Sequence, residues 1–384
     1  MIGYILRRSG QILVTLFLFF TLAFFLIQAQ PGSYASFYAF NPQVPPEARA
    51  QVEAAFGLDK PLWQQYLLHL KNYGTGNFGV SFSHYPNTVV EVILERLPRT
   101  VMLFLTATVV SFYAGFLLGK AIAWKRGGVL EYTATISGTV LFTVFTPWFG
   151  LMMIWLFAFQ LDWFPLGKFL DPLVWRTATV DANTVFGNLL LTGLGFGLFA
   201  LVATLAVSRL VRRRHRGLVL LPLLGTVAAA IPLVWWLSGT GYLALDILRH
   251  MVLPVLTLTL ISFAGTMLLT RNSMLETIRE DYIMVARAKG LSEKAIRDRH
   301  AARNALLPVV TSFVFSLAFA IDGGVITEGI FSWPGMGLTL LSAVLTEDMP
   351  LAIGAFVFVG IFALVAHLVA DVLYVYLDPR IRYH

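Results

Sequence analysis

The chain has 384 residues, of which 57% are hydrophobic and only 13% are charged, and its formal net charge is +7 at pH 7. This composition excludes an ordinary water-soluble domain and favours a membrane protein. The sequence contains no cysteine, which excludes disulfide bonds and thiolate metal sites, and it lacks the motifs of soluble nucleotide-binding domains and metalloproteases.

Eight long runs without Asp, Glu, Lys or Arg predict eight transmembrane helices. Each run reaches the roughly 17–25 residues that a helix needs to cross a bilayer. The backbone must satisfy its own hydrogen bonds in hydrocarbon, so the predicted fold class is an all-α polytopic membrane protein. The runs are residues 9–41, 100–119, 132–161, 182–208, 217–245, 251–270, 304–321 and 351–370.

The N-terminal region, residues 1–30, is predicted to be an uncleaved membrane anchor. It begins with the basic residues Arg7 and Arg8, and its apolar run is longer than the corresponding part of a signal peptide.

Residues 31–99 form the largest predicted extracytoplasmic segment. We expect one helix over residues 45–56 and a second helix that follows Asp59 and Pro61 and ends near Gly74. From these residues alone the segment is a lid, a platform for an external partner, or a packed connector.

The remaining chain divides into three predicted regions. Residues 100–171 hold the second and third helices, and residues 172–245 form an inserted transmembrane hairpin. Residues 246–384 form the rest of the membrane domain, including a cytoplasmic loop over residues 271–305. Glycines in the second and fourth helices are expected to permit close helix approach. These are Gly115, Gly119, Gly193, Gly195 and Gly197.

The distribution of Lys and Arg predicts the orientation in the membrane. Basic residues flank the predicted helices on the side that includes the N-terminus, residues 209–216 and the C-terminus, which places both termini in the cytoplasm. We interpret the 209–216 cluster as an anchor to anionic lipid rather than a nucleic-acid site.

The segment 271–303 is the most informative part of the chain because it places a charged, helical surface outside the lipid. It carries eight basic and five acidic residues, with apolar and small residues at helical spacing. Gly290 is expected to end one helical stretch, and Ser292 is expected to cap the next. The segment alone suits either an amphipathic interfacial helix or a docking element for a cytosolic protein.

The sequence of residues 281–310, DYIMVARAKGLSEKAIRDRHAARNALLPVV, resembles the EAA loop of permeases from binding-protein-dependent ABC importers. The resemblance is to the dipeptide, oligopeptide and nickel subfamily, whose motif is close to DYxxxARAKGLSxxxxxxRHALRNALLPV. Met284 and Val285 replace the first Glu and Ala of the general EAA consensus. Matching residues are Asp281, Tyr282, Ala286, Arg287, Ala288, Lys289, Gly290, Leu291, Ser292, Arg299, His300, Ala301, Arg303, Asn304, Ala305, Leu306, Leu307 and Pro308.

Other segments are also similar to this subfamily, and together they cover nearly the whole chain except about residues 172–245. The family core has six membrane spans, so the resemblance implies a six-helix importer permease with two additional helices. The similar segments are residues 57–70, 76–83, 95–101, 248–260, 270–282, 328–337 and 371–383.

The resemblance implies a function and a set of partners. The chain would be the permease subunit of an ATP-driven importer of dipeptides or oligopeptides in a bacterial or archaeal inner membrane. Its implied partners are a homologous second permease, two cytosolic ATPases, an extracytoplasmic substrate-binding protein and membrane lipid. ATP and Mg would be bound by the ATPases, so no cofactor, catalytic residue, metal site or nucleic acid is expected in this chain.

The resemblance also assigns roles within the loop. Ala286 and Gly290 are expected to pack in a groove of the ATPase, with Arg287 and Lys289 contacting its carboxylates. The whole turn is expected to couple to the ATPase, namely Asp281, Tyr282, Ala286, Arg287, Ala288, Lys289, Gly290, Leu291 and Ser292. Five further motif residues are expected to brace the loop against the seventh helix, although an ordinary polar helix end is an alternative. These bracing residues are Arg299, His300, Arg303, Asn304 and Pro308.

Three polar residues fall within predicted spans, where a charged group costs about 2.5–3.5 kcal/mol at the bilayer centre. Asp322 lies in the seventh helix, and His367 and Asp371 lie four residues apart on one face of the eighth. We expect a polar lining of the substrate path, a proton relay, or interhelical hydrogen bonds between permease subunits.

Two other functional classes remain open from the residues alone. A proton-coupled secondary transporter or a non-transporting assembly factor would need no ATPase partner. Within the resembling family, nickel chelates and oligosaccharides are alternative substrates.

Overall fold

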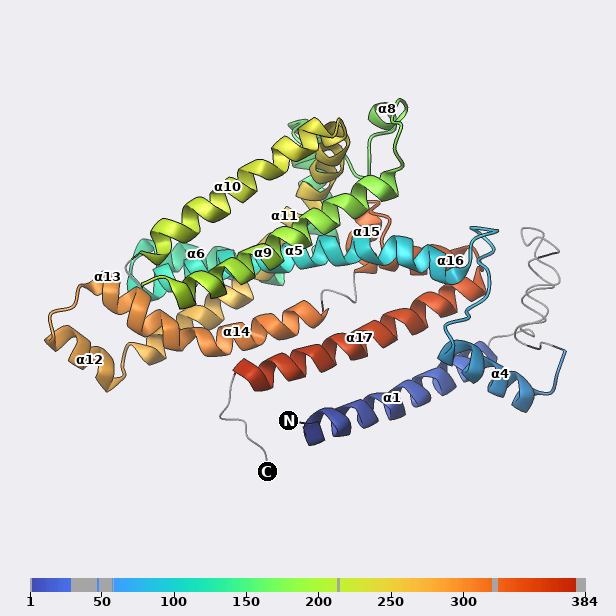
Figure 1. Cartoon of the computed structure of the whole chain (residues 1–384), viewed down its shortest axis with the longest axis horizontal. Coiled ribbons are helices and arrows are strands. Elements are labelled where there is room, and N and C mark those ends of the chain that lie inside the picture. The colour runs from blue at the N-terminus through green and yellow to red at the C-terminus, as the bar shows by residue number, and fades with distance from the viewer. Residues whose placement is uncertain are drawn as a thin grey trace. The chain divides into compact units, whose positions relative to one another are not determined.

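The computed structural model describes residues 2–28, 47, 57, 59–212, 215–319 and 324–377. Within these ranges the regular structure is helical, which confirms the all-α class, and one isolated antiparallel bridge joins Val80 to Thr88. The chain divides into two compact units. Figure 1 shows the helices in chain order by colour. Unit 1 comprises Met1–Met153 and Pro254–His384, and unit 2 comprises Ile154–Leu253.

Six helices of the described chain are long and apolar enough to cross a membrane, and they coincide with six of the eight predicted spans. The helix α14 (Ala302–Phe319) covers the seventh predicted span as far as Phe319, and the rest of that span lies outside the described residues. The six are α1 (Ile2–Gln28), α5 (Val89–Trp124), α9 (Ala182–Leu210), α10 (Arg216–Leu237), α11 (Gly241–Thr277) and α17 (Met349–Leu377).

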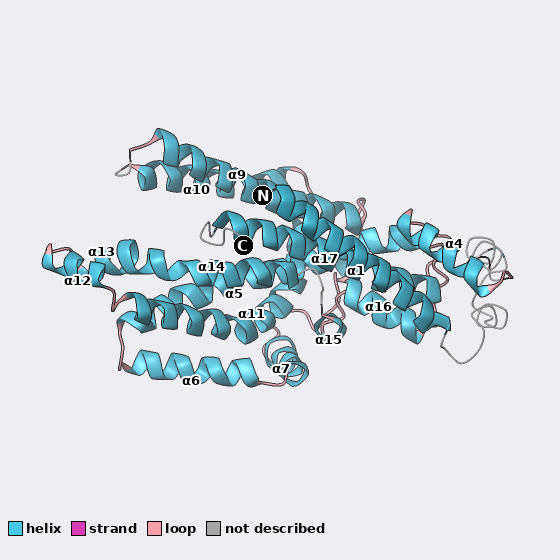
Figure 2. Ribbon diagram, turned by 90° about the horizontal axis from the view of Figure 1, so that it is seen from below, coloured by secondary structure: helices cyan, strands magenta, loops and turns pink. Residues whose placement is uncertain are grey.

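The third predicted span is not one continuous helix. It consists of α6 (Val129–Thr143), then α7 (Thr146–Met153), which continues into the π-helix η1 (Ile154–Gln160), and its axis bends by 107° between α6 and α7. Figure 2 shows this change of direction. Pro147 stands at the start of α7; it lacks an N–H group, and its ring would clash with the carbonyl of Thr143 if α6 continued as a regular helix.

Shorter helices complete both units. The predicted extracytoplasmic helix after Pro61 is present as α4, whereas the predicted helix over residues 45–56 lies almost entirely outside the described residues. The shorter helices are α4 (Leu62–Gly74), α8 (Pro172–Trp175), α12 (Asp281–Ala288), α13 (Glu293–Ala295), the π-helix η2 (Ile296–Ala301), α15 (Val325–Ile330) and α16 (Met336–Leu345).

The helix α17 is central to the packing of unit 1. It contacts α1, α5, α14 and α16, and Figure 1 shows it between α1 and α14. Leu351, Ala355 and Val357 of α17 are completely buried in a cluster with side chains of α5 and of the 76–83 segment. Apolar burial therefore joins the N-terminal and C-terminal parts of the chain in one core.

Candidate coupling site

The segment between α11 and α14 begins with α12, which ends in a Schellman turn. Gly290 has φ +73°. The N–H of Gly290 donates to the carbonyl of Arg287 at 2.9 Å, and the N–H of Leu291 donates to the carbonyl of Ala286 at 3.3 Å. This is the predicted left-handed end of the helix. An added Cβ at Gly290 would have no atom within 4 Å, so backbone conformation rather than space requires glycine here.

The second predicted cap is also present. Ser292 precedes α13, and its Oγ accepts a hydrogen bond from the N–H of Ala295 at 3.3 Å. The chain then continues through η2 directly into α14. These local bonds make residues 281–301 a short, ordered helix–turn–helix element rather than an open loop.

One face of this element is buried in unit 1. Ile283 and Ile296 are completely buried, and Ala286 is 5% exposed. They pack with the ends of α5, α11 and α14 in a set that we call the coupling cluster. It consists of Ala123, Met274, Ile283, Ala286, Ile296, Ala301, Ala302 and Ala305.

The position of Ala286 changes the role expected for it. The sequence motif predicted that Ala286 packs in a groove of the ATPase, but its side chain is enclosed by residues of its own chain. We therefore assign Ala286 to the attachment of α12 to the membrane helices. The other motif residues of the turn lie at the surface: Asp281, Tyr282, Arg287, Ala288, Lys289, Gly290, Leu291 and Ser292.

An apolar patch lies on the opposite face of α12. Met284 is 67% exposed, Val285 is 51% exposed and Leu291 is 40% exposed. Sequence reasoning treated Met284 and Val285 only as departures from the EAA consensus and missed their exposure. Helical spacing predicts this exposure, because residues one and two positions after the buried Ile283 do not share its face of the helix.

Several charged residues in and beside this element form ion pairs. Arg287 Nε lies 3.2 Å from Glu293 Oε1 across the Gly290 turn, and both side chains are exposed. Asp298 accepts two hydrogen bonds from Arg297, at 2.9 and 3.0 Å, and lies 3.3 Å from Lys120 Nζ of α5. The Arg297 hydrogen bonds and the Lys120 ammonium lower the pKa of Asp298 to about 2.

Among the predicted bracing residues, Asn304 makes a contact of the expected kind. Its Nδ2 donates to the hydroxyl of Tyr282 at 2.6 Å and so ties α12 to α14. Arg299, Arg303 and Pro308 are exposed, and His300 is half-buried. The bracing role of these four residues stays a prediction.

Comparison with known proteins identifies the family of the chain. Residues 193–383 match the model of the binding-protein-dependent transport system inner membrane component, and residues 1–104 match the model of its N-terminal region. The chain belongs to this family. It is therefore a multi-pass protein of the bacterial inner membrane, as its apolar helices also indicate.

Named relatives span the whole permease. A di/tripeptide transport system permease protein, DppB, of Pseudomonas aeruginosa is 32% identical over 383 residues, which cover 100% of this chain and 99% of the relative. The dipeptide permease DppB of Lactococcus lactis is 31% identical, with both chains covered completely. The oligopeptide permease AppB of Bacillus subtilis is 28% identical, again with complete coverage of both chains.

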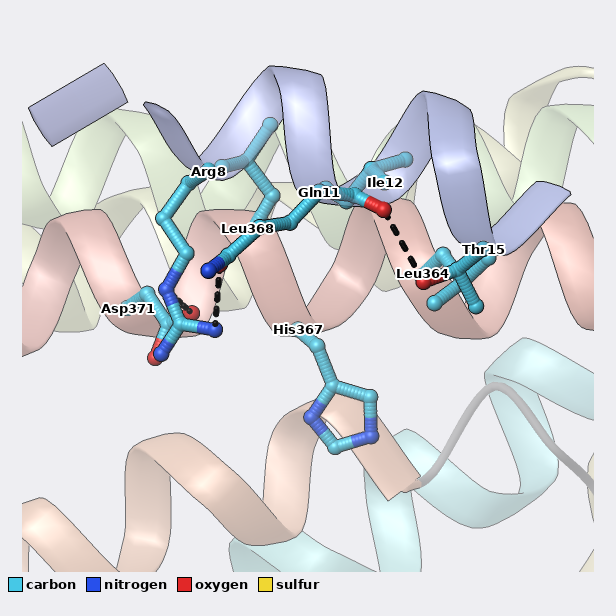
Figure 3. Close-up of a pocket in the computed structure, with 8 residues that line it drawn as sticks. All are labelled: Arg8, Gln11, Ile12, Thr15, Leu364, His367, Leu368 and Asp371. Carbon is cyan, nitrogen blue, oxygen red and sulfur yellow. Dashed lines mark hydrogen bonds and ion pairs between the residues drawn. The ribbon is translucent and has the colours of Figure 1, made fainter. Parts of the chain in front are cut away.

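One of the polar residues expected within the membrane spans contacts another helix of the same chain. Asp371 of α17 forms an ion pair with Arg8 of α1, with Nε and Oδ2 3.2 Å apart, whereas His367 points away from this pair (Figure 3). The structure thus shows an interhelical ion pair within one chain, and the roles expected for His367 and Asp371 stay predictions. Asp322 lies outside the described residues.

A small cavity adjoins this ion pair. Its volume is about 110 Å³, enough for a few water molecules, and its lining mixes polar and apolar side chains of α1 and α17 (Figure 3). The lining residues are Arg8, Gln11, Ile12, Thr15, Leu364, His367, Leu368 and Asp371.

Glu328 forms a buried polar cluster with α5 that sequence reasoning missed. Its side chain is completely buried, its Oε1 accepts from Thr100 Oγ1 at 2.7 Å, and its Oε2 accepts from the N–H of Leu338 at 2.9 Å. Burial raises the pKa of Glu328. Thr100 Oγ1 also accepts from the N–H of Met336 at 2.7 Å, and Trp333 Nε1 donates to the neighbouring Arg99 carbonyl at 3.2 Å.

Asp348 forms a second buried polar cluster just before α17. Its Oδ2 accepts hydrogen bonds from the hydroxyls of Ser81 and Ser83, both at 2.6 Å, and from the N–H of Ser83 at 2.9 Å. These bonds attach the 76–83 segment to the start of α17, because a carboxylate that is 1% exposed needs its donors. Two segments that carried the family resemblance, 76–83 and 328–337, are thus anchors of the fold.

Proposed function

We propose that the permease is the membrane subunit of an ATP-driven, binding-protein-dependent importer of dipeptides or oligopeptides and that it forms half of the translocation pathway. The observation that supports peptide as substrate is the set of relatives at about 30% identity, all matched over their full length and named as peptide permeases. Nickel chelates and oligosaccharides are the alternative substrates.

The proposed partners follow from the family. They are a homologous second permease, an extracytoplasmic substrate-binding protein and two cytosolic ATPases, which would bind ATP and Mg while this chain catalyses no reaction. The exposed patch of Met284, Val285 and Leu291 suits docking of a short helix into a groove of an ATPase. Lys289 at its edge is available for a carboxylate of the partner.

The proposed orientation places residues 271–305 and both termini in the cytoplasm. It rests on the excess of Lys and Arg on that side of the predicted spans. The segments around Ser81 and Glu328 then lie on the extracytoplasmic side, where a binding protein delivers substrate.

The proposed mechanism is a rigid displacement. The coupling cluster buries one face of α12 against the ends of α5, α11 and α14. A displacement of α12 by the ATPase would therefore move these helices with it, because packed interiors transmit strain rather than deform. By thermodynamic linkage, a binding protein that binds one conformation of the permease more tightly also shifts the conformational equilibrium of the ATPases on the other side of the membrane.

We further propose that residues 172–245 form an additional hairpin that faces lipid. Within unit 2, α9 and α10 contact one another, and α10, which is described in full, has no buried residue. An all-round apolar, exposed helix in a membrane protein suits lipid contact.

The test of the docking proposal is Gly290→Asp, with Gly127→Asp as the matched control. Both glycines have positive φ, +73° and +80°, and neither has an atom within 4 Å of an added Cβ. We expect both variants to insert normally and only Gly290→Asp to lose co-purification of the ATPases. If Gly290→Asp retains its ATPases and transports normally, or if both variants lose them equally, the docking role is wrong.

Uptake by the reconstituted complex tests the proposed class of transporter. We expect dipeptide uptake into proteoliposomes that requires ATP and the binding protein and that a protonophore leaves unchanged. Uptake driven by a proton gradient without ATP would instead identify a secondary transporter.

A further inference from the structure

The helix α5 is attached to polar partners at both ends of its membrane span, and this arrangement suggests a role beyond packing. We propose that α5 is a second transmission element. It links the helix–turn–helix element of residues 281–301, which we call the coupling segment, to the 328–337 segment through the positioning residues Lys120 and Thr100. The proposal rests on the proposed importer function. Movement would pass through α5 in addition to α11 and α14, the two helices that directly flank the coupling segment.

The inner attachment consists of an ion pair and apolar packing. Lys120 Nζ lies 3.3 Å from Asp298 Oδ1 of η2, and both side chains are largely shielded from solvent. Ala123 belongs to the coupling cluster, and Trp124 packs against it. The last turns of α5 therefore contact the coupling segment through both an ion pair and apolar packing.

The outer attachment is a buried hydrogen-bond network around Thr100, the first residue of the predicted span. Thr100 Oγ1 donates to the buried carboxylate of Glu328 and accepts from the N–H of Met336, both at 2.7 Å. An added Cβ at Gly335 would lie 2.4 Å from Thr100 Oγ1, so the 328–337 segment approaches α5 as closely as glycine permits. The start of α16 lies beside α5 in Figure 1.

The distance between these attachments equals the thickness of the membrane core. Thr100 and Lys120 are 20 residues apart on one continuous helix, which corresponds to about 30 Å along its axis. The hydrocarbon core of a bilayer is also about 30 Å thick. In the proposed orientation α5 thus joins an extracytoplasmic network to the cytoplasmic coupling segment.

The inner part of α5 packs directly against α11. An added Cβ at Gly115 would lie 2.6 Å from the carbonyl oxygen of Phe263, and one at Gly119 would lie 2.5 Å from that of Met267. The two backbones are therefore in direct contact, as small residues allow between membrane helices. A shift imposed on the inner end of α5 would be carried to Thr100 without being absorbed along the way.

The experiment measures how strongly the substrate-loaded binding protein stimulates ATP hydrolysis by the complete complex in proteoliposomes. For Lys120→Met we expect normal assembly, unchanged basal hydrolysis and at least about a fivefold fall in the stimulation ratio, the lower end of typical allosteric coupling. Lys120→Arg should retain the ratio, because it keeps the charge. Lys125→Met, which changes an exposed lysine at the same helix end, is the matched control and should also retain it.

Thr100→Val tests the outer attachment and, with Lys120→Met, tests whether the two attachments act in series. We expect Thr100→Val to lower the same ratio, Thr100→Ser to preserve it, and the double variant to be no worse than the more affected single variant. If Thr100→Val fails to assemble, the Lys120 variants alone decide.

Two results overturn the proposal while leaving the importer function intact. One is an unchanged stimulation ratio in Lys120→Met, and the other is a double variant in which the two defects multiply, as independent local effects would. If the wild-type permease associates with no ATPase, the importer function fails and this proposal fails with it.

Discussion

The helices α5 and α10 are both long, apolar and continuous, yet their surroundings in the two units are opposite. Residues along the whole of α5 are buried against other elements of unit 1, including Arg99, Thr100 and both Gly115 and Gly119. In α10, all of which is described, no residue is buried. Hydropathy therefore selects helices for the membrane but does not show which of them pack tightly against other helices, as α5 does at Gly115 and Gly119.

The largest expected effect comes from a large side chain at a helix contact in unit 1. Gly119→Leu places its Cβ 2.5 Å from the Met267 carbonyl oxygen and 2.7 Å from the Thr270 Cβ, which forces α5 and α11 apart. We expect destabilisation at or above the usual ~1–3 kcal/mol of overpacking, because backbone atoms cannot rotate away. Thermal unfolding in detergent and the yield of monodisperse subunit measure it.

The control is Gly195→Leu on α9 of unit 2. An added Cβ there meets no atom within 4 Å, so we expect wild-type yield and thermal stability. Equal damage from both substitutions would contradict the distinction between the packed and the lipid-facing helices.

The next largest effect separates the two faces of the coupling segment. Ile283→Ala removes a completely buried side chain and should cost about 2–5 kcal/mol, as core truncations do. Met284→Ala, at a position that is 67% exposed, should change stability by no more than about 0.5 kcal/mol but weaken ATPase binding. Thermal unfolding and ATPase co-purification, measured on both variants, test this; the reverse pattern would refute it.

A smaller effect is expected at the polar contact of unit 2. Trp175 Nε1 donates to Asp246 Oδ2 at 2.9 Å, and Trp175→Phe should cost about 1 kcal/mol, the usual contribution of a hydrogen bond. Asp246 keeps the N–H of Asp171 at 3.0 Å as a second donor, which limits the loss. Trp236→Phe, at an exposed position of α10, is the matched control and should leave the unfolding temperature unchanged.

The smallest effect is a pH dependence of the inner attachment. The pKa of Asp298 is lowered to about 2, so its carboxylate stabilises the folded state above its ordinary pKa and this stabilisation is lost as the pH falls toward 2. The difference in unfolding temperature between wild type and Asp298→Asn should be constant from about pH 5 to about pH 8 and shrink below about pH 4. A difference that grows with acidification would show that Asp298 is not held ionised by its partners.

Local rules predicted much of the coupling segment from sequence. Gly290 and Ser292 were expected to end one helix and cap the next, because both roles depend on neighbouring residues alone. A proline, Pro147, also stands at the break in the third predicted span, but a charge-free run does not by itself show where a helix bends. Helical spacing puts Ala286 on the same face as Ile283, three residues earlier, and both side chains are buried in the coupling cluster.

Contacts between distant parts of the chain were not predictable in the same way. The pairs Lys120–Asp298, Arg8–Asp371 and Thr100–Glu328 join segments that only the folded helix packing brings together. The two groups of glycines show the same limit. Gly115 and Gly119 contact α11 as expected, whereas Gly193, Gly195 and Gly197 have no atom of the described chain within 4 Å of an added Cβ, and their packing role stays a prediction.

Cysteine cross-linking at the exposed patch tests the central claim most directly, because the chain has no cysteine of its own. In a transport-competent complex with Met284→Cys, we predict a cross-link to an ATPase subunit, while Leu198→Cys on α9 gives none. If Met284→Cys yields no such cross-link, or reacts in intact cells with a maleimide that cannot cross the membrane, the coupling surface lies elsewhere and the account is contradicted.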